Sequence, residues 1–299
     1  MAANKLNIVV GIATSGRPQL LSQAISILAE QTRLPDRLVI CPVTADDVDE
    51  QSIKSFPRPT DIVNGPIGLP AQRNLILESV RGAEIIVFFD DDYFADARYI
   101  ENLEHIFLRY PDLVAATGFL LADGARGPGF SAKEGLEILR SAPSLDGAQS
   151  ELIEWDSTYG CNMSFRLKPI FDHDIRFDES LPLYGWQEDI DFSRRVLPYG
   201  RIVISGMLRG VHLGIKLGRT SGVRFGYSQI ANPIYLARKG SMPWWYAKKL
   251  MWRNMAANLT RSLYSEPWID RRGRLKGNML ALLDIVRGRL SPGRILRMD

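Results

Sequence analysis

The sequence predicts an α/β protein with a doubly wound, mostly parallel central sheet, flanking helices and a basic helical extension at the carboxyl end. Three observations support this fold class. Short β-branched segments alternate with segments of helical periodicity in the first half of the chain. One apolar strand segment ends in three consecutive aspartates, where ligands bind in open α/β sheets. Residues 238–299 contain 14 Lys and Arg residues against four Asp and Glu, so the charge balance changes sign near the end.

The first half of the chain alternates predicted strands with predicted helices. Apolar, β-branched runs predict strands at 7–13, 37–41, 61–63, 85–89 and 113–121. Apolar residues at helical spacing predict helices at 19–31, 69–80 and 99–110, the first of them just after Pro18. This order favours parallel strands, because two parallel strands need a crossover that is usually a helix.

The second half is less regular. Loops are expected at 123–129 and 141–149, and a short helix is expected between them at 132–140. Further strands are expected at 151–159, 163–166 and 201–208, and a helix with an acidic start at 187–197. The boundary near 215–240 has no strong pattern.

Composition narrows the class of protein. Hydrophobic residues make up 45% of the chain and charged residues 24%, which is typical of a globular protein with a sizeable core. No run reaches 18 apolar residues, and residues 1–6 lack the apolar core of a signal peptide. Cys41 and Cys161 lie in unrelated segments, which indicates a reducing compartment and no disulfide framework.

The aspartate triplet indicates a metal site. Asp90, Asp91 and Asp92 follow the apolar run 85–89, and their mutual repulsion would be relieved by a divalent cation that prefers oxygen ligands. Because side chains alternate along a strand, Asp90 and Asp92 should point together and Asp91 the other way. The alternative is a solvated acidic turn.

Four segments, in order along the chain, resemble motifs of the family 2 glycosyltransferases, which have the nucleotide-diphosphosugar transferase fold called GT-A. They are Ile-Ala-Thr-Ser-Gly-Arg-Pro at 12–18, Gly-Leu-Pro-Ala-Gln-Arg-Asn at 68–74, Phe-Asp-Asp-Asp at 89–92 (like the DxD motif) and Gly-Trp-Gln-Glu-Asp-Ile-Asp-Phe at 185–192 (like the acceptor-side Glu-Asp motif). The resemblance covers about residues 6–215. It implies a catalytic domain at 1–215, with a nucleotide-sugar half at 1–122 and an acceptor half at 123–215, followed by an extension at 216–299.

The resemblance also implies a donor site. Thr14 and Arg17 would line the nucleotide pocket, together with Asp91, and Arg73 would contact the base or the diphosphate. The alternatives are a surface cation at Arg17 and an exposed helical arginine at Arg73. The family's acidic, Ser-containing loop after the second strand is missing at 42–47, where Asp46 or Asp47 could replace the base contact.

The metal would be manganese or magnesium. In the resemblance Asp90 lies near the ribose or the metal, Asp92 binds the metal, and His212 completes the site. A histidine packed in the core is the alternative for His212. Gly160 and Asn162 would line the donor-sugar pocket, although Asn162 could instead cap a turn.

The acceptor side is expected to supply the base. The resemblance assigns proton removal to Asp189, with Glu188 binding an acceptor hydroxyl or holding Asp189 in place. Trp186 could stack on a sugar face. The alternative is that Glu188 and Asp189 only favour the start of a helix.

The basic end carries four of the six tryptophans, which fits an anionic membrane better than a nucleic acid. On one predicted helix Trp244, Met251, Met255 and Leu259 share a face. On a second, Leu275, Met279, Leu282, Val286 and Leu290 are in register. The alternative is a pair of helices that only cover the catalytic domain. A cytoplasmic protein, peripheral at the inner face of the membrane, is expected.

The expected function is that of a metal-dependent inverting glycosyltransferase. It would move a sugar from a nucleotide-diphosphate sugar, with UDP the common case in the family, to a saccharide or lipid-linked saccharide in polysaccharide or glycolipid synthesis. A sugar nucleotidyltransferase is disfavoured because its glycine-rich loop is missing. An aspartate-nucleophile phosphatase expects Thr or Val where Phe94 stands. A non-catalytic carbohydrate-binding scaffold would not need Asp90, Asp92 and Asp189.

Overall fold

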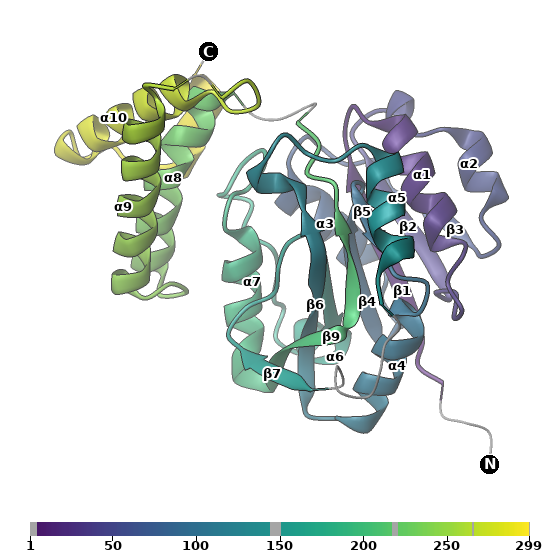
Figure 1. Cartoon of the computed structure of the whole chain (residues 1–299). Helices are drawn as coiled ribbons and strands as arrows, with labels where there is room; N and C mark the ends of the chain where they lie inside the picture. The colour runs from purple at the N-terminus through teal and green to yellow at the C-terminus, as the bar shows by residue number, and fades with distance from the viewer. Residues whose placement is uncertain (1–4, 144–150, 217–220, 265, 299) are drawn as a thin grey trace. The chain divides into compact units, whose positions relative to one another are not determined.

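The computed structural model describes residues 5–143, 151–216, 221–264 and 266–298, which form two compact units (Figure 1). The first, the sheet unit, is built from residues 5–67, 71–176 and 196–216. The second, the helical unit, combines residues 68–70 and 177–195 with the described residues after 220. The predicted boundary at residue 215 separates a catalytic domain from an extension by their expected functions. It stays a prediction.

Within the described residues of the sheet unit, nine strands form one sheet, with β7 paired to β9 off the path β3-β2-β1-β4-β8-β6-β9-β5. The strands are β1 Ile8–Thr14, β2 Arg37–Pro42, β3 Thr60–Ile62, β4 Ile85–Asp90, β5 Tyr93–Ala95, β6 Leu113–Asp123, β7 Leu152–Trp155, β8 Asn162–Arg166 and β9 Arg201–His212. Strands β3, β2, β1 and β4 pair in parallel, as do β6 and β9, whereas β5, β7 and β8 run antiparallel to their partners. The predicted fold class, a mostly parallel doubly wound sheet, is confirmed.

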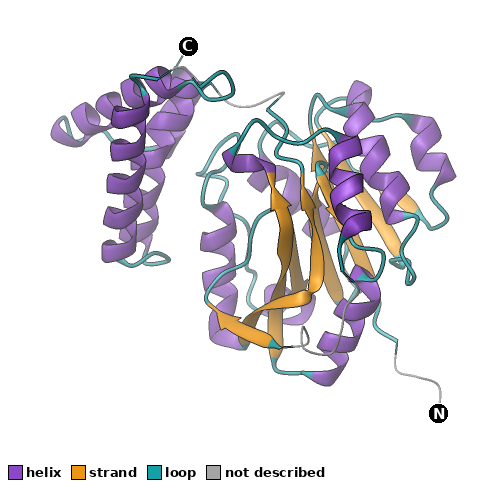
Figure 2. Ribbon diagram, in the orientation of Figure 1, coloured by secondary structure: helices purple, strands orange, loops and turns teal. Residues whose placement is uncertain are grey.

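Helices pack on both faces of this sheet (Figure 2). They are α1 Pro18–Leu28, α2 Glu50–Ser55, α3 Leu69–Ser79, α4 Tyr99–Arg109, α5 Ala132–Ser141 and α6 Leu167–Asp172. Alternation along β1 explains the two layers. Ile8, Val10 and Ile12 join the core formed with α1 and α4. Gly11 faces the other way, where an added Cβ would lie 2.6 Å from Ile76 of α3.

Most predicted elements are confirmed, and the differences have local causes. The strand predicted at 151–159 is confined to β7, and the strand predicted at 201–208 continues to His212 because β9 also pairs with β5. The predicted loop at 123–129 contains a 3₁₀ turn, Gly124–Arg126. Within the sheet unit, the prediction did not include α2, β5 or α6. Residues 144–150 of the loop predicted at 141–149 lie outside the described residues.

The helical unit contains α7 Glu188–Val196, α8 Gly222–Lys239, α9 Trp244–Arg261 and α10 Arg271–Val286. A buried amide network joins the last three. Asn258 of α9 donates to Gln229 of α8 at 2.8 Å and to Asn278 of α10 at 2.9 Å. Asn278 in turn donates to the Gly226 carbonyl at 2.6 Å. These amides are buried and mutually satisfied, so they fix one packing of the three helices.

The apolar face predicted for α9 is wrong in part. Met251 and Met255 pack against the core of the helical unit, because they lie on the side of α9 that faces α8 and α10. The outer side instead exposes Trp245 (65%), Trp252 (69%) and Leu259 (60%), which repeat every seven residues and share one helix face. On α10, Leu282 likewise packs inward, as does Leu290 after its end, whereas Met279 and Val286 are exposed. In the described chain, no helix is both long enough and apolar enough to cross a bilayer.

One close approach positions β6 against β9. The two strands shift register after Gly118, where a Cβ would lie 1.6 Å from the Leu208 carbonyl oxygen. The backbone fixes the position of a Cβ, and the oxygen belongs to the backbone, so no change of rotamer can relieve the clash.

We therefore expect Gly118→Ala to lower the free energy of unfolding by about 1–3 kcal/mol, as overpacking does in other cores. Gly127→Ala is the matched control. No heavy atom lies within 4 Å of an added Cβ there, so the change should stay within about 0.5 kcal/mol. Urea unfolding of the three proteins measures both effects, and equal midpoints would contradict the expectation.

Candidate functional site

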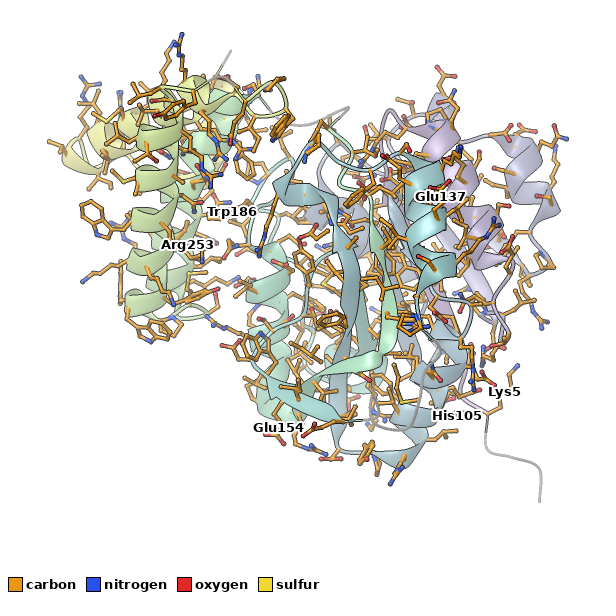
Figure 3. The ribbon with its side chains drawn as sticks, viewed as in Figure 1. Lys5, His105, Glu137, Glu154, Trp186 and Arg253 are labelled. Atoms are coloured by element: carbon orange, nitrogen blue, oxygen red, sulfur yellow. The ribbon has the colours of Figure 1, made fainter. Side chains whose placement is uncertain are left out.

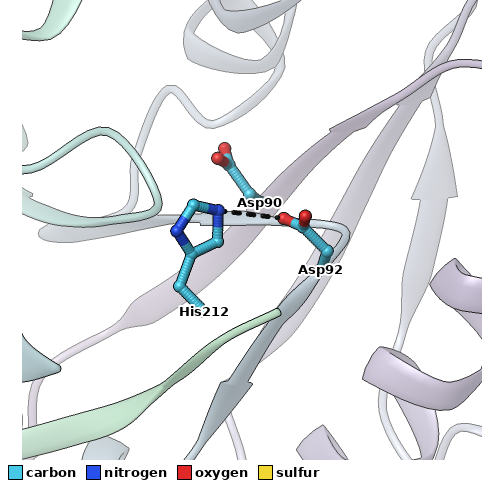
Figure 4. A group of neighbouring side chains, drawn as sticks. All are labelled: Asp90, Asp92 and His212. Atoms are coloured by element: carbon cyan, nitrogen blue, oxygen red, sulfur yellow. Dashed lines mark ion pairs between the residues drawn. The ribbon is translucent and has the colours of Figure 1, made fainter. Parts of the chain in front are cut away.

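Strand ends bring three possible metal ligands together. Asp90 ends β4, Asp92 follows it, and His212 ends β9. One ligand atom from each residue lies within 4.8 Å of the others, as expected for a common metal (Figure 4). The predicted cluster of Asp90, Asp92 and His212 is therefore present in the geometry.

A neighbouring carboxylate holds the imidazole of His212. Its Nδ1 lies 2.9 Å from Asp123 Oδ1, and its Nε2 lies 3.4 Å from Asp92 Oδ1. Burial opposes a charged imidazole, but the hydrogen bonds and charges of Asp123 and Asp92 outweigh it and raise the pKa of His212 to about 10. His212 is buried, as in the core alternative, yet both ring nitrogens face carboxylates.

Asp92 is held as a carboxylate. Its Oδ2 accepts the Ile215 N–H at 2.9 Å and lies 3.6 Å from Arg17. Burial would raise its pKa, but His212, Arg17 and the Ile215 N–H together lower the pKa to about 2. A carboxylate that stays charged in a buried position is suited to a cation.

Asp91 points toward β1 and away from the metal ligands. Its Oδ2 accepts from the Thr14 hydroxyl at 2.7 Å, and its Oδ1 lies 2.9 Å from Arg17. Burial dominates here and raises the pKa of Asp91 to about 7, although Arg17 opposes the rise. Thr14 and Arg17 thus lie at the site but bind the aspartates, and their contact with a nucleotide stays a prediction.

Arg73 lies in the core, so the exposed-arginine alternative is wrong. Only 2% of Arg73 is exposed, and its Nη2 donates to Asp90 Oδ1 at 2.9 Å and to the Gly160 carbonyl at 2.8 Å. Arg73 also lowers the pKa of Asp90, but burial outweighs it and the net shift is upward. Arg73 therefore orients a candidate metal ligand and fixes the Gly160 loop, and direct contact with a base or diphosphate stays a prediction.

Asn162 links two strands instead of capping a turn. Its Oδ1 accepts from the Gly118 N–H at 2.6 Å and from the Thr117 hydroxyl at 2.7 Å, and the residue is fully buried. A role for Asn162 in a donor-sugar pocket stays a prediction, as does that of Gly160.

The loop after β2 is organised by Asp47. Its carboxylate accepts N–H bonds from Gly16 at 2.5 Å, Val43 at 3.0 Å and Thr44 at 2.7 Å. Although burial opposes the charge, these N–H groups lower the pKa of Asp47. Asp46 is exposed, whereas Asp47 is buried.

The donor set fits a hard or borderline divalent cation. Two carboxylates and one imidazole suit manganese or magnesium. Asp123 orients the imidazole of His212, as a carboxylate hydrogen-bonded to a ligating histidine does at many metal sites. The His212 imidazolium offsets only one of the two carboxylate charges, so the ionised group still attracts a divalent cation.

The residues expected on the acceptor side lie in the helical unit. Glu188 and Asp189 begin α7, and Asp189 Oδ1 accepts the Ile190 N–H at 2.9 Å. Glu188 is buried, and Asp189 is half-buried. Trp186 precedes them in a loop, and its carbonyl accepts from Asn232 at 2.8 Å (Figure 3).

Sequence reasoning missed one residue of the site, Asp123. Asp123 ends β6 and is the register partner of His212 across the parallel pair β6–β9. The rule that drew attention to Asp90 and Asp92, an acid at the carboxyl end of a strand, would have found it. Asp47 was expected only as a possible base contact. Its role in organising the loop was not predicted, because that role depends on backbone N–H groups from two loops.

The fold is similar to that of solved glycosyltransferases of the GT-A type. No protein-family model matches the chain, and neither does any curated protein sequence. Among solved structures, S. aureus TarS 1–349 in complex with UDP-GlcNAc has a TM-score of 0.59 at 12% identity, over 97% of this chain and 83% of that one.

Two other structures match over nearly the whole chain. The mannosyltransferase PcManGT from Pyrobaculum calidifontis, in complex with GDP-Man and Mn²⁺, has a TM-score of 0.56 at 14% identity over 98% of this chain and 86% of that one. GalNAc-T7 with UDP, GalNAc and Mn²⁺ has a TM-score of 0.56 at 11% identity, over 99% of this chain and 56% of that one. Another TarS structure is longer, and the chain spans 40% of it. The TM-scores of these matches show the shared fold. The sequence identities are low, and membership of family 2 stays a prediction.

The pKa of His212 predicts a pH dependence of stability in the metal-free protein. The group has a pKa of about 10 when folded, against an ordinary value of 6.5. Its stabilising effect is therefore complete below pH 6.5 and is lost as the pH rises toward 10. With EDTA present, the stability difference between the parent and His212→Gln should shrink over this range. Thermal unfolding at several pH values measures it, and a constant difference would refute the assignment.

Proposed function

We propose that the chain is a metal-dependent inverting glycosyltransferase that uses a nucleotide-diphosphate sugar, with UDP-sugar as the first donor to test. The observation that carries the proposal is the cluster of Asp90, Asp92 and His212 at the strand ends of a GT-A sheet. Structures that share this fold contain UDP-GlcNAc, UDP or GDP-Man, and two of them contain Mn²⁺. Family 2 membership is part of the proposal.

In the proposed reaction, an acceptor hydroxyl oxygen attacks the anomeric carbon of the donor from the face opposite the diphosphate. The bond from that carbon to the diphosphate oxygen breaks, and the diphosphate leaves with the bonding electrons. The hydroxyl proton passes to Asp189. A divalent metal held by Asp90, Asp92 and His212 would neutralise the charge that grows on the diphosphate. Arg73 orients Asp90, and Asp123 presents the Nε2 of His212.

Other assignments belong to the same proposal. Thr14, Arg17 and Asp91 would border the nucleotide, with Arg73 behind them, and Gly160 and Asn162 would shape the donor-sugar pocket. Glu188 would bind the acceptor or support Asp189, and Trp186 would stack on a sugar. The acceptor would be a saccharide or a lipid-linked saccharide in polysaccharide or glycolipid synthesis.

Asp92→Ala tests the metal site. Removing this carboxylate should abolish Mn²⁺-dependent binding of UDP, because no other charged side chain replaces Asp92 as a metal ligand. Isothermal titration with and without Mn²⁺ measures the effect, and Asp172→Ala, at an exposed aspartate of α6, serves as the control. Unchanged metal-dependent affinity in Asp92→Ala would refute the assignment of the metal to this site.

Asp189→Asn tests the base. The amide keeps the shape and loses the basicity, so sugar transfer should fall by about 10² or more while donor binding persists. A transfer assay with labelled donor, paired with donor titration, separates the two effects. Near-normal turnover would move the role to another residue, with Glu188 or Asp191 next.

We also propose that residues 238–299 attach the enzyme to the inner face of an anionic membrane, as a cytoplasmic, peripheral protein. The outer face of α9 supports this proposal. Trp245, Trp252 and Leu259 are exposed on it, and Leu263, just after the helix, is 79% exposed. Lys248 and Lys249 lie on the same helix face within three or four residues of Trp245. Exposed Arg253, labelled in Figure 3, follows Trp252 in the sequence. Tryptophan with flanking cations is typical of interfacial helices.

The triple change Lys248→Glu, Lys249→Glu and Arg253→Glu should release the protein from vesicles rich in phosphatidylserine, because each basic residue near such a surface adds about 1 kcal/mol. Binding of the parent should also weaken with salt, since surface charges are screened over about 10 Å at 0.1 M. Liposome sedimentation measures both. The matched control changes Arg58, Lys133 and Lys168 of the sheet unit to Glu, with the same shift in net charge. Equal pelleting of all variants on neutral and anionic vesicles, at any salt, would reduce the tail to structural packing.

A further inference from the structure

The loop that leads into α7 is held in a strained conformation. Leu183, Gly185 and Gln187 have positive φ angles of 60°, 62° and 76°. Such angles cost about 1–3 kcal/mol for residues other than glycine, and they persist where the surroundings enforce them. Here the Leu183 carbonyl accepts from the Leu69 N–H at 2.8 Å. A Cβ at Gly185 would lie 2.7 Å from the Pro70 ring.

The strained loop presents two aromatic side chains around a third. The rings of Tyr184 and Trp186 lie 5.9 and 6.0 Å from the ring of Phe225 on α8, between centroids. The Arg274 guanidinium of α10 lies 4.4 Å from the centre of the same ring. Packing alone would bury these rings, but Tyr184 is 54% exposed and Trp186 and Phe225 are partly exposed. Tyr184, Trp186 and Phe225 are called the aromatic platform below.

Two amide oxygens beside the platform lack a donor among the described residues. Asn232 is 2% exposed, and its Nδ2 donates to the Trp186 carbonyl, but its Oδ1 accepts no hydrogen bond in the described chain. The buried Oε1 of Gln187, the residue after Trp186, accepts none there either. A buried acceptor without a donor costs about 1–3 kcal/mol, so a hydroxyl-bearing ligand would stabilise both positions.

We infer that the aromatic platform is a saccharide subsite that holds the acceptor. A pyranose ring has an apolar C–H face that packs on an aromatic ring, and hydroxyl groups at its edge that donate to amide oxygens. Trp186 of the platform lies two residues before Glu188 and three before Asp189, so a sugar bound there belongs to the acceptor side. The inference rests on the proposed function for the acceptor role. Tyr184 and Phe225 lie outside the four motif segments, and no role was expected for either.

The experiment measures saccharide binding directly. The full chain, with UDP and Mn²⁺ present, is applied to an oligosaccharide microarray, and the dissociation constant of the strongest retained glycan is measured by titration. Tyr184→Ala and Phe225→Ala should each weaken this binding at least tenfold, whereas Tyr184→Phe should retain it. Tyr264→Ala is the matched control, because Tyr264 is also an exposed tyrosine of the helical unit but lies outside the platform. Thermal unfolding confirms that each variant folds.

Two results would overturn the inference: no glycan retained by the parent chain, or unchanged affinity in folded Tyr184→Ala and Phe225→Ala. Failure of the proposed function is a separate result. If the chain binds glycans through the platform but neither transfers nor hydrolyses a UDP-sugar, the saccharide subsite is supported and the proposed enzyme activity is refuted. If the chain hydrolyses UDP-sugar with Mn²⁺ but Tyr184→Ala leaves glycan binding unchanged, only the inference about the platform is refuted.

Discussion

The repulsion between three consecutive carboxylates is the constraint on which the sheet unit depends. Asp90, Asp91 and Asp92 are brought together by chain connectivity, and each is balanced by a cation from another element. Arg73 comes from α3, Arg17 from the residue before α1, and His212 from the end of β9. Each cation fixes where its element must lie relative to β4. The positions of α1, α3 and β9 are therefore tied to the charge balance of the site as well as to apolar packing.

Much of this arrangement could be predicted from the sequence, because it follows from strand ends. Asp90, Asp92 and His212 each end or follow an apolar strand, and parallel strands bring such ends to one edge of a sheet. The alternation rule also placed Asp91 on the opposite side. These inferences need only local pattern and the direction of the strands.

The rest depended on tertiary contacts that no local pattern encodes. Arg73 carries a charge on a helix and would ordinarily be exposed, but Asp90 and the Gly160 carbonyl satisfy it in the core. Helix α8 was not predicted, because 215–240 has no strong pattern. Pro233, Gly222 and Gly226 lie within the helix, where proline and glycine are unfavourable. Close packing against α10 overrides that propensity. A Cβ at Gly226 would lie 2.1 Å from the Arg274 carbonyl oxygen, so glycine is required there. The methionines of α9 were grouped on one face with Leu259, but they pack inward while Leu259 is exposed, because apolar residues occur on two faces of the helix.

The amide network of Gln229, Asn258 and Asn278 has a consequence for how the helical unit can change. Hydrogen bonds are directional, so sliding α9 by one residue would leave three buried amides unsatisfied, whereas a purely apolar seam would tolerate the shift. The information that specifies the packing of α8, α9 and α10 is therefore held on their inner sides. The residues on the outer side of α9 do not specify this packing. They can therefore be substituted, by divergence or by design, so that the helix recognises a different surface while the packing of the three helices is kept.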